Sequence, residues 1–352
     1  MIPVFRPRLP STDSLIPLLA EVELNQIYSN FGPLVRRLEE YLAEFFRVGS
    51  RNITTLCNAT LALEGAVKVI TTQIEWVSPS WTFTATNLAL QNSGVKFNFE
   101  DIGLDWRLKE LDTSKGIMDV CPFGDSVDFT RYLQHPGPIL IDAAGSYPSL
   151  ENVGEQLLKE SKNIGIVVSF HPTKILPGIE GGVFISNNAD WVTKVRAWSN
   201  FGFAENSRIT QKAGTNAKMN EFQAAMILAS IQDFRDRKFY WTELHKKAMQ
   251  LSETLGLQCQ PAMQRGKLST YWIIQSEESI INEIAQISES FGFQTRRWWN
   301  FGCHKMPAYK SFNALLPITE NIASRTIGLP FHLCLRDEDF SVIERGIKTI
   351  LG

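Results

Sequence analysis

A lysine at position 174 offers the most specific chemistry in the sequence. It ends the run Ser169-Phe-His-Pro-Thr-Lys174, and the run Ile175-Leu-Pro-Gly-Ile-Glu-Gly-Gly182 follows it. A lysine attacks a carbonyl when its amine is neutral, which partial desolvation or a neighbouring cation favours. An isolated lysine is more often an ordinary surface residue. Here the hydroxyl groups of Ser169 and Thr173, together with the glycines that let backbone approach a ligand, favour a lysine held ready to form a Schiff base.

A carboxylate that suits this lysine is Asp142, in the run Pro138-Ile-Leu-Ile-Asp-Ala-Ala144. The run is typical of a buried strand, so the carboxyl group is expected where the strand ends. A pyridoxal phosphate ring withdraws electrons only while its ring nitrogen is protonated, and a buried aspartate paired with that nitrogen keeps the proton there. By itself Asp142 fits a helix N-cap or a turn equally well. In combination with Lys174 it indicates a pyridoxal phosphate site.

Two strand-to-helix junctions suit the remaining contacts of such a cofactor. Cys57-Asn-Ala-Thr60 closes one strand and precedes a helix that begins near Leu61, which places backbone N–H groups and a hydroxyl where a phosphate binds. Thr82-Phe-Thr-Ala-Thr86 places the ring of Phe83 at the next junction, where it can stack on a flat heterocycle. Taken alone, the first junction is more often a plain helix cap and the second a core aromatic.

These residues lie among short apolar runs that alternate with helical stretches. The expected strands are 53–57, 74–77, 95–99, 139–141, 164–170 and 183–185, and the expected helices are 61–70 and 84–91. Such alternation predicts an α/β fold with a mostly parallel sheet flanked by helices. Sites in sheets of this kind gather at the carboxyl ends of the strands, which is where the candidate residues lie.

A long helix and a second group of strands are expected after this sheet. Residues 220–250 contain no Pro or Gly and are rich in helix-forming residues. Short strands at 257–260, 271–275 and 293–297, with a helix at 280–291, predict a smaller C-terminal α+β domain. We place the boundary near residue 240, which gives a large domain of residues 1–240 that includes the N-terminal segment, and a small domain of residues 241–352.

Composition excludes several classes of protein. The 352 residues carry 35 Lys plus Arg against 37 Asp plus Glu, so no overall field attracts nucleic acid or an anionic membrane. The five cysteines show no spacing typical of zinc sites or disulfide frameworks. The N-terminus lacks the apolar run of a signal peptide, and no segment approaches about 20 uninterrupted apolar residues. A soluble cytoplasmic enzyme without a metal site is expected.

A series of short motifs extends over most of the chain. They are Ser29-Asn-Phe-Gly-Pro33, Leu38-Glu39, Asn58-Ala-Thr60, Pro79-Ser-Trp-Thr-Phe-Thr-Ala-Thr86, Asp142-Ala-Ala144, Ser169-Phe-His-Pro-Thr-Lys174, Glu180-Gly-Gly182, Asn216-Ala-Lys-Met-Asn-Glu-Phe-Gln-Ala-Ala225 and Leu329-Pro-Phe-His332. Each motif is weak alone, and their order carries the identification. In this order they resemble the DegT-type nucleotide-sugar aminotransferases, a branch of the fold type I pyridoxal phosphate enzymes.

The resemblance implies a role for each matching residue. Lys174 would form the internal aldimine with pyridoxal 5'-phosphate and move the proton during catalysis. The ring nitrogen would pair with Asp142, and Phe83 would stack on the ring. The phosphate would be bound by three residues of one subunit, Ala59, Thr60 and Ser169. Asn216 would reach the phosphate of the neighbouring subunit's cofactor, so the resemblance implies a homodimer with shared active sites.

Three departures from the family pattern affect the surroundings of the cofactor. The family usually has His or Gln three positions after the aspartate, and this chain has Gly145. The usual Gly before Thr60 is Ala59, which adds a Cβ near the phosphate. The segment from Ser146 to Lys162 lacks the usual Gly-rich spacer and Gly-Asp pair. These departures leave Lys174 and Asp142 unchanged but put cofactor affinity and substrate shape in question.

Other residues could take part in catalysis or substrate binding, but the sequence gives weaker evidence for a role of each. His171 is expected to be a structural neighbour of Lys174, because the lysine itself is placed to move the proton. His304 lies where similar enzymes have a loop near the sugar. Arg296, Arg297, Trp298 and Trp299 suit a nucleotide, and they equally suit a packed rim.

The resemblance implies a reaction in two halves. L-glutamate would give its amino group to the cofactor and leave as 2-oxoglutarate, and a nucleotide-linked keto sugar would then take the amine. The Asn200-Phe-Gly-Phe203 turn and the segment from Met219 to Ala225 are most similar to enzymes that aminate carbon four of a dTDP-4-keto-6-deoxyhexose, for O-antigen, other polysaccharide or glycoside biosynthesis. The alternatives are a 3-keto sugar on the same machinery, and a non-catalytic homologue that acts as a binding or regulatory dimer.

Overall fold

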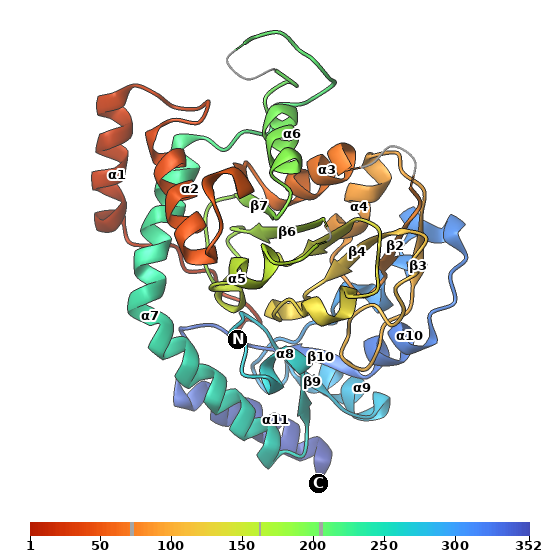
Figure 1. Cartoon of the computed structure of the whole chain (residues 1–352). Helices are drawn as coiled ribbons and strands as arrows, with labels where there is room; N and C mark the ends of the chain where they lie inside the picture. Colours follow the sequence, from red (N-terminus) through yellow and green to blue (C-terminus); the bar gives the residue numbers. More distant parts are fainter. Residues whose placement is uncertain (71–73, 162, 204–206) are drawn as a thin grey trace.

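The larger of two sheets forms the centre of the molecule. The computed structural model describes residues 1–70, 74–161, 163–203 and 207–352 (Figure 1). Seven strands form this sheet, in the order β1 (Ile53–Leu56), β7 (Gly182–Ser186), β6 (Ile164–Ser169), β5 (Ile139–Asp142), β4 (Gly116–Val120), β2 (Trp76–Pro79) and β3 (Phe97–Glu100). All neighbouring pairs are parallel except those of β7 with β6 and with β1. This mostly parallel mixed sheet confirms the predicted α/β fold.

Helices cover both faces of the sheet, and the strands are buried on both sides. Successive side chains of a strand point to opposite faces. Ile164, Ile166 and Val168 of β6 therefore pack with α2 (Pro33–Phe46) and α7 (Glu221–Thr254). Val167 faces the other way and packs with α3 (Ala59–Ile70), α4 (Thr84–Asn92) and α6 (Ala189–Ser199). Burial on both faces explains the continuous apolar runs from which these strands were predicted.

Two buried glutamates of the helical layer tie it to the sheet. Glu39 of α2 accepts hydrogen bonds from the backbone N–H of Thr55 at 2.8 Å and from the Thr55 hydroxyl at 3.0 Å, on the edge strand β1. Glu221, the first residue of α7, accepts the N–H groups of Leu34 and Val35 at 2.7 and 3.0 Å. These are N–H groups of the first turn of α2, which have no partner within the helix, so α7 supplies the cap that α2 lacks.

The smaller sheet lies in the C-terminal part of the chain. Its order is β10 (Thr326–Leu329), β9 (Trp272–Gln275) and β8 (Gln258–Cys259), with both pairs antiparallel. The helices of this part are α8 (Pro261–Gln264), α9 (Glu278–Ile287), α10 (Pro317–Ser324) and α11 (Asp337–Leu351). The remaining helices are α1 (Thr12–Asn25), which packs on α7, and the short α5 (Gly154–Leu157). No helix in the described ranges is both long enough and apolar enough to cross a membrane.

Helix α7 belongs to both parts of the molecule. It begins beside α1 and α2 and reaches the layer of the small sheet (Figure 1). The N-terminal segment also contacts the C-terminal part, because Ile2 N–H donates to Gly292 O at 2.7 Å and Phe331 N–H donates to Val4 O at 3.0 Å. Residue 240 falls inside α7, so we keep the division into residues 1–240 and 241–352 as a proposal.

Three details of the secondary structure differ from the sequence prediction. Residues 293–297 were expected to form a strand, which is wrong, since they make only isolated bridges, from Phe293 to Ile2 and from Arg296 to Gly328. The third strand of the small sheet is β10 instead. Both β10 and β4 were missed, because their sequences, Thr-Ile-Gly-Leu and Gly-Ile-Met-Asp-Val, contain residues that are depleted in strands.

Candidate active site

Lys174 lies in a tight loop after β6, at the carboxyl end of that strand. The loop is closed at its base, because Phe170 N–H donates to Gly181 O at 2.9 Å and Gly178 N–H donates to Phe170 O at 2.6 Å. The side chain of Lys174 is half-buried, and its Nζ donates to the hydroxyl of Tyr271 at 3.2 Å. The amine is therefore held inside the molecule rather than free in solvent, as the sequence predicts.

Asp142 ends the neighbouring strand β5 and is almost completely buried, with 6% of the residue exposed. Its Oδ2 accepts a hydrogen bond from the Thr86 hydroxyl at 2.6 Å, and its Oδ1 accepts the backbone N–H of Ala144 at 3.0 Å. Burial raises the pKa of Asp142, although these two hydrogen bonds and the charge of Lys174 act to lower it. Asp142 ends β5, which pairs in parallel with β6, and Lys174 lies in the loop after β6, so the two residues lie at the same edge of the sheet.

Ser169 and the start of α3 meet at the same edge of the sheet. Ser169, the last residue of β6, pairs with Gly182 of β7, and Gly182 also pairs with Leu56 of β1. A Cβ at Gly182 would lie 2.6 Å from the backbone nitrogen of Ala59, so the glycine allows the helix to begin against the sheet. This places Ser169 close to the first turn of α3, which contains Ala59 and Thr60. The three residues predicted to bind phosphate are thus neighbours.

The first turn of α4 connects Phe83 with Asp142. Phe83 is the N-cap residue of α4, and Thr86, three positions later, donates the hydrogen bond to Asp142. The Phe83 ring is 61% exposed, so it is available to a flat ligand rather than packed in the core. The alternative of a plain core aromatic is therefore wrong for Phe83.

Asn216 is exposed and immediately precedes a buried stretch that passes the end of β1. Ala217 O accepts the N–H of Cys57 at 2.8 Å, which fixes the segment beside the Cys57–Thr60 junction. The Asn216 side chain accepts a hydrogen bond from Lys218 Nζ at 2.7 Å, and this amine also lies 4.3 Å from the centroid of the Phe201 ring. A contact of Asn216 with a neighbouring subunit's cofactor stays a prediction.

The histidines and Arg297 have structural contacts. His171 Nδ1 lies 2.9 Å from the Thr173 hydroxyl, within the lysine loop, as expected of a structural neighbour. His304 is buried, with Nδ1 at 2.6 Å from the Ser80 hydroxyl and Nε2 at 3.3 Å from Glu320. Arg297 donates to the backbone oxygens of residues 323, 324 and 326. A side chain held by three carbonyl oxygens is part of a packed rim rather than a nucleotide site.

The space beside Gly145 is occupied by another part of the chain. A Cβ at this position would make ordinary contacts, at 3.4 Å with Gly124 N and at 3.9 Å with Cε2 of the Tyr271 ring. The segment after Asp142 forms a 3-10 turn at Tyr147–Leu150 and the helix α5, and its last residue, Lys162, lies outside the described residues. At Gly145, where this chain departs from the family pattern, an aromatic side chain from the C-terminal part therefore lies in the neighbouring space.

Two residues of the site were not predicted. Thr86 was visible in the sequence as part of the Phe83 junction, and its spacing of three residues within a first helical turn was the available signal. Tyr271 had no such signal, because it is 97 residues from Lys174 and only the packing of the small sheet brings it there.

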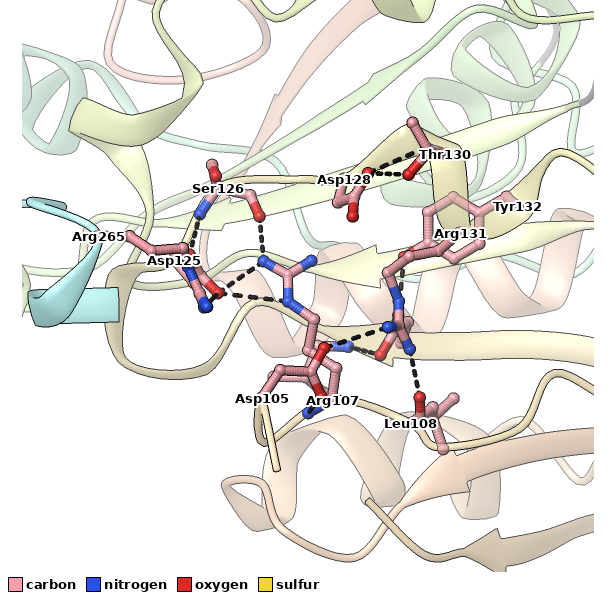
Figure 2. Close-up of polar contacts among 12 residues, drawn as sticks. Asp105, Arg107, Leu108, Asp125, Ser126, Asp128, Thr130, Arg131, Tyr132 and Arg265 are labelled. Carbon is pink, nitrogen blue, oxygen red and sulfur yellow. Dashed lines mark hydrogen bonds and ion pairs between the residues drawn. The ribbon is translucent and has the colours of Figure 1, made fainter. Parts of the chain in front are cut away.

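A second buried carboxylate, Asp125, lies in the loop after β4 (Figure 2). It accepts hydrogen bonds from the guanidinium group of Arg107, with Nη2 to Oδ2 at 2.7 Å, and from that of Arg265. The Asp125 and Arg107 side chains are only 1% and 5% exposed. Burial would raise the pKa of Asp125, but the two cations outweigh it and lower the pKa. Asp125 connects the large sheet with the segment that leads to Tyr271.

Comparison with known proteins identifies the family. The model of the DegT/DnrJ/EryC1/StrS aminotransferase family matches residues 12–347. The chain belongs to this family. It is therefore a pyridoxal phosphate-dependent aminotransferase, as the motif order predicted.

Individual relatives are similar at modest identity. A dTDP-4-amino-4,6-dideoxy-D-glucose transaminase of Shigella dysenteriae is 30% identical over 244 residues, which are 65% of this chain and 65% of the relative. A transaminase of the same name from Escherichia coli is 24% identical over 100% of this chain and 98% of its own length. Among solved structures, DesI in the presence of its TDP-sugar product has a TM-score of 0.85 at 27% identity and covers 99% of this chain and 92% of its own.

The fold agrees with these relatives. A PLP-dependent aminotransferase structure from Bacillus cereus superposes with a TM-score of 0.86 at 24% identity and covers 99% of both chains. This likeness confirms the fold type I architecture predicted from the sequence. The comparisons do not support the alternative of a non-catalytic homologue, because the family is one of aminotransferases.

The residues of the site fit pyridoxal phosphate. The cofactor needs an amine, a buried carboxylate for its ring nitrogen and an anion site for its phosphate. Lys174 supplies the half-buried amine, and the buried Asp142, with its raised pKa, supplies the carboxylate. The first turn of the 12-residue helix α3 and the hydroxyl of Ser169 would supply the anion site.

Proposed function

We propose that this enzyme moves an amino group from L-glutamate to the keto carbon of a nucleotide-linked 4-keto-6-deoxy sugar, with dTDP as the nucleotide. The names of the relatives from Shigella dysenteriae and Escherichia coli, and the sugar product of DesI, support this substrate class. The observation that carries the proposal is the juxtaposition of Lys174 and Asp142 at the carboxyl ends of β6 and β5.

Lys174 and Asp142 would have different roles in the reaction. When bound, the cofactor supplies the carbonyl carbon that carries the amino group and a ring that withdraws electrons. Asp142 would hold the ring nitrogen, with Thr86 and the Ala144 N–H fixing the orientation of its carboxyl group. Lys174 Nζ would take up and return the proton that moves during transfer, because it is the flexible amine of the site. The same amine would act in both halves of the reaction. Because 2-oxoglutarate would leave before the keto sugar takes up the amino group, the kinetics should be ping-pong.

The other predicted residues would hold the cofactor in place. The first turn of α3, with Ala59 and Thr60, would bind the phosphate through backbone N–H groups and the dipole of the helix, and Ser169 would add its hydroxyl. Phe83 would cover one face of the ring. Asn216 would contribute from the neighbouring subunit, so that a homodimer is the functional unit.

The cellular setting follows from this activity as part of the proposal. An aminated nucleotide sugar is a building block for glycosyl transfer, so the enzyme would serve O-antigen, other polysaccharide or glycoside biosynthesis. We place the enzyme in the cytoplasm, where nucleotide sugars and pyridoxal phosphate are available.

Replacement of Lys174 tests the mechanism. Lys174→Ala should lower turnover by more than about 10⁴-fold, because the variant loses both the nucleophile and the group that moves the proton. The measurement is release of 2-oxoglutarate from glutamate in the presence of a panel of nucleotide-linked keto sugars. Lys246→Ala, on the exposed side of α7, is the matched control and should retain wild-type turnover. Turnover by Lys174→Ala close to that of the control would refute the mechanism.

A second substrate class is the 3-keto sugar. A UDP-2-acetamido-2-deoxy-3-oxo-D-glucuronate aminotransferase of Pseudomonas aeruginosa is 24% identical to this chain over 330 residues. The site chemistry is the same for both classes, since Lys174 and Asp142 act on the cofactor rather than on a given sugar carbon. NMR of the aminated product separates them by the position of the new amine.

A further inference from the structure

The C-terminal part of the chain reaches into the site through two adjacent residues. Tyr271 immediately precedes β9, and its hydroxyl lies 3.2 Å from Lys174 Nζ. The preceding residue, Thr270, donates its hydroxyl to the backbone oxygen of Thr173 at 2.9 Å. Two neighbours on one segment thus bind two neighbours on the lysine loop. The phenol is therefore held at the amine by backbone anchoring as well as by its own hydrogen bond.

The ring of Tyr271 is wedged between two aromatic side chains. Phe123 lies edge-on at 5.3 Å between ring centroids, and Trp298 lies edge-on at 5.1 Å. Gly145 also borders the ring, since an added Cβ there would be 3.9 Å from Cε2, at ordinary contact distance. Position 145 and the phenol ring therefore border the same space. Gly145 consequently leaves the space beside the Tyr271 ring free of a side chain of its own.

Tyr271, Phe123, Trp298 and Trp299 form an aromatic cluster, and two of its members have unfavourable backbone conformations. Phe123 and Trp299 have φ angles of 54° and 53°, in the left-handed region that bulky residues rarely adopt. Their rings stack at 4.5 Å with an interplanar angle of 14°. Strained residues of this kind persist where the surrounding structure determines them, and they concentrate at functional sites. The cluster therefore gives Tyr271 a rigid support.

The ion pairs of the buried Asp125 fix the segment that carries Tyr271. Asp125 binds Arg265, at the start of this segment, and Arg107 from the large sheet's side (Figure 2). Next to Asp125, Gly124 approaches the segment closely, since a Cβ there would lie 2.6 Å from Cβ of Ser269. The segment from Arg265 to Tyr271 is thus held against the loop after β4 at both ends.

We propose that Tyr271 is a catalytic residue, whose phenol oxygen accepts an N–H of Lys174 Nζ and orients this amine during proton transfer. The phenol takes the space that Gly145 leaves open, so a group from the C-terminal part replaces a side chain of the large sheet. Asp125, by contrast, is a positioning residue, because it acts on Lys174 only through the segment that holds Tyr271. The inference rests on the proposed function in one respect, which is that Lys174 moves the proton.

The test is Tyr271→Phe in the cofactor-loaded enzyme, which keeps the ring and removes one hydroxyl. We expect kcat to fall about tenfold with KM for both substrates within about twofold, since one hydrogen bond at the reacting amine is lost. The pH midpoint of the cofactor's visible absorbance, measured without substrate, should move to lower pH by on the order of one unit, because the phenol oxygen stabilises the protonated nitrogen. Tyr41→Phe removes a phenol that lies 3.4 Å from the Tyr147 hydroxyl, and it should leave both quantities unchanged.

A midpoint for Tyr271→Phe equal to that of Tyr41→Phe would overturn the proposal. Because this readout needs no sugar, it is independent of the substrate assignment, and a wrong sugar would show as absent turnover in every variant. A second test asks whether a side chain at position 145 and the Tyr271 ring compete for the same space. Gly145→Gln should lower activity in the wild-type background, through collision with the ring, and should be neutral or restoring in the Tyr271→Ala background. If the activity losses of the two substitutions simply add in the double variant, the two side chains do not compete for one space.

Discussion

Two buried aspartates of this protein have opposite electrostatic surroundings. Asp142 and Asp125 are both nearly inaccessible, at 6% and 0% exposed. Asp142 accepts hydrogen bonds from a hydroxyl and a backbone N–H, and burial raises its pKa. Asp125 is bound by two guanidinium groups, which lower its pKa in spite of burial (Figure 2).

The difference indicates that Asp142 is suited to bind a charged ligand group, whereas Asp125 stabilises the structure. A buried carboxylate with neutral partners costs stability, so the fold tolerates it at Asp142 where a protonated ring nitrogen can become its partner. A buried carboxylate that is already matched by cations has no charge left to offer a ligand, and it fixes two parts of the chain instead. The same residue type would therefore serve cofactor binding at Asp142, as proposed, and architecture at Asp125.

The largest expected effect follows from removing the charge of Asp142. Asp142→Asn should lower kcat by about 10²–10⁴-fold, because a neutral amide does not hold the proton on the cofactor ring. The unfolding free energy of the cofactor-free protein should be equal to that of wild type or higher, since the variant loses an unfavourable buried charge. Urea denaturation and steady-state kinetics measure the two quantities. Marked destabilisation of the cofactor-free variant would contradict the comparison.

The matching change at Asp125 should act on stability. Asp125→Asn should lower the unfolding free energy by about 3 kcal/mol, because the Arg107 guanidinium is left buried without its carboxylate. The double variant Asp125→Leu with Arg107→Met should lose less than the single variant, since neither charge then remains. Urea denaturation of the three proteins tests this order. Equal stability of Asp125→Asn and wild type would show that Asp125 does not fix the structure.

A smaller effect is the pH dependence that distinguishes the two carboxylates. The pKa of Asp125 is lowered in the folded state, so the stability it contributes is present above the ordinary value of 3.8 and is lost as pH falls through the lower folded pKa. The folded pKa of Asp142 is raised, so its penalty is relieved as pH falls. The difference in unfolding free energy between wild type and Asp125→Asn should therefore shrink in acid. For Asp142→Asn, any excess over wild type should also shrink. Denaturation across a pH series checks both trends.

The sequence predicts that Lys174 and Asp142 lie near each other because both positions depend on local features. Lys174 and Asp142 each follow a buried apolar strand, and parallel strands bring their carboxyl ends to one edge of the sheet. The register of β5 and β6 then places Asp142 opposite Val167, two residues before Ser169. Strand pattern and strand direction together were enough to expect these residues in one site.

The surroundings of the lysine could not be predicted in this way. Tyr271 and Arg265 reach the site from 97 and 140 residues beyond their partners, Lys174 and Asp125. Their positions depend on how the small sheet packs, which no periodicity records. The missed strand β10 has the same cause, because its weak propensity is overridden by pairing with β9.

The contact between Glu39 and Thr55 affects whether other protein chains can associate with the edge of the large sheet. Strand β1 is an edge of the large sheet, and an edge strand offers unpaired N–H groups to any other chain. The Glu39 carboxylate already occupies the Thr55 N–H, and Arg196 binds the same carboxylate and holds it in place. One acidic side chain in α2 thus protects the central sheet against strand addition and aggregation.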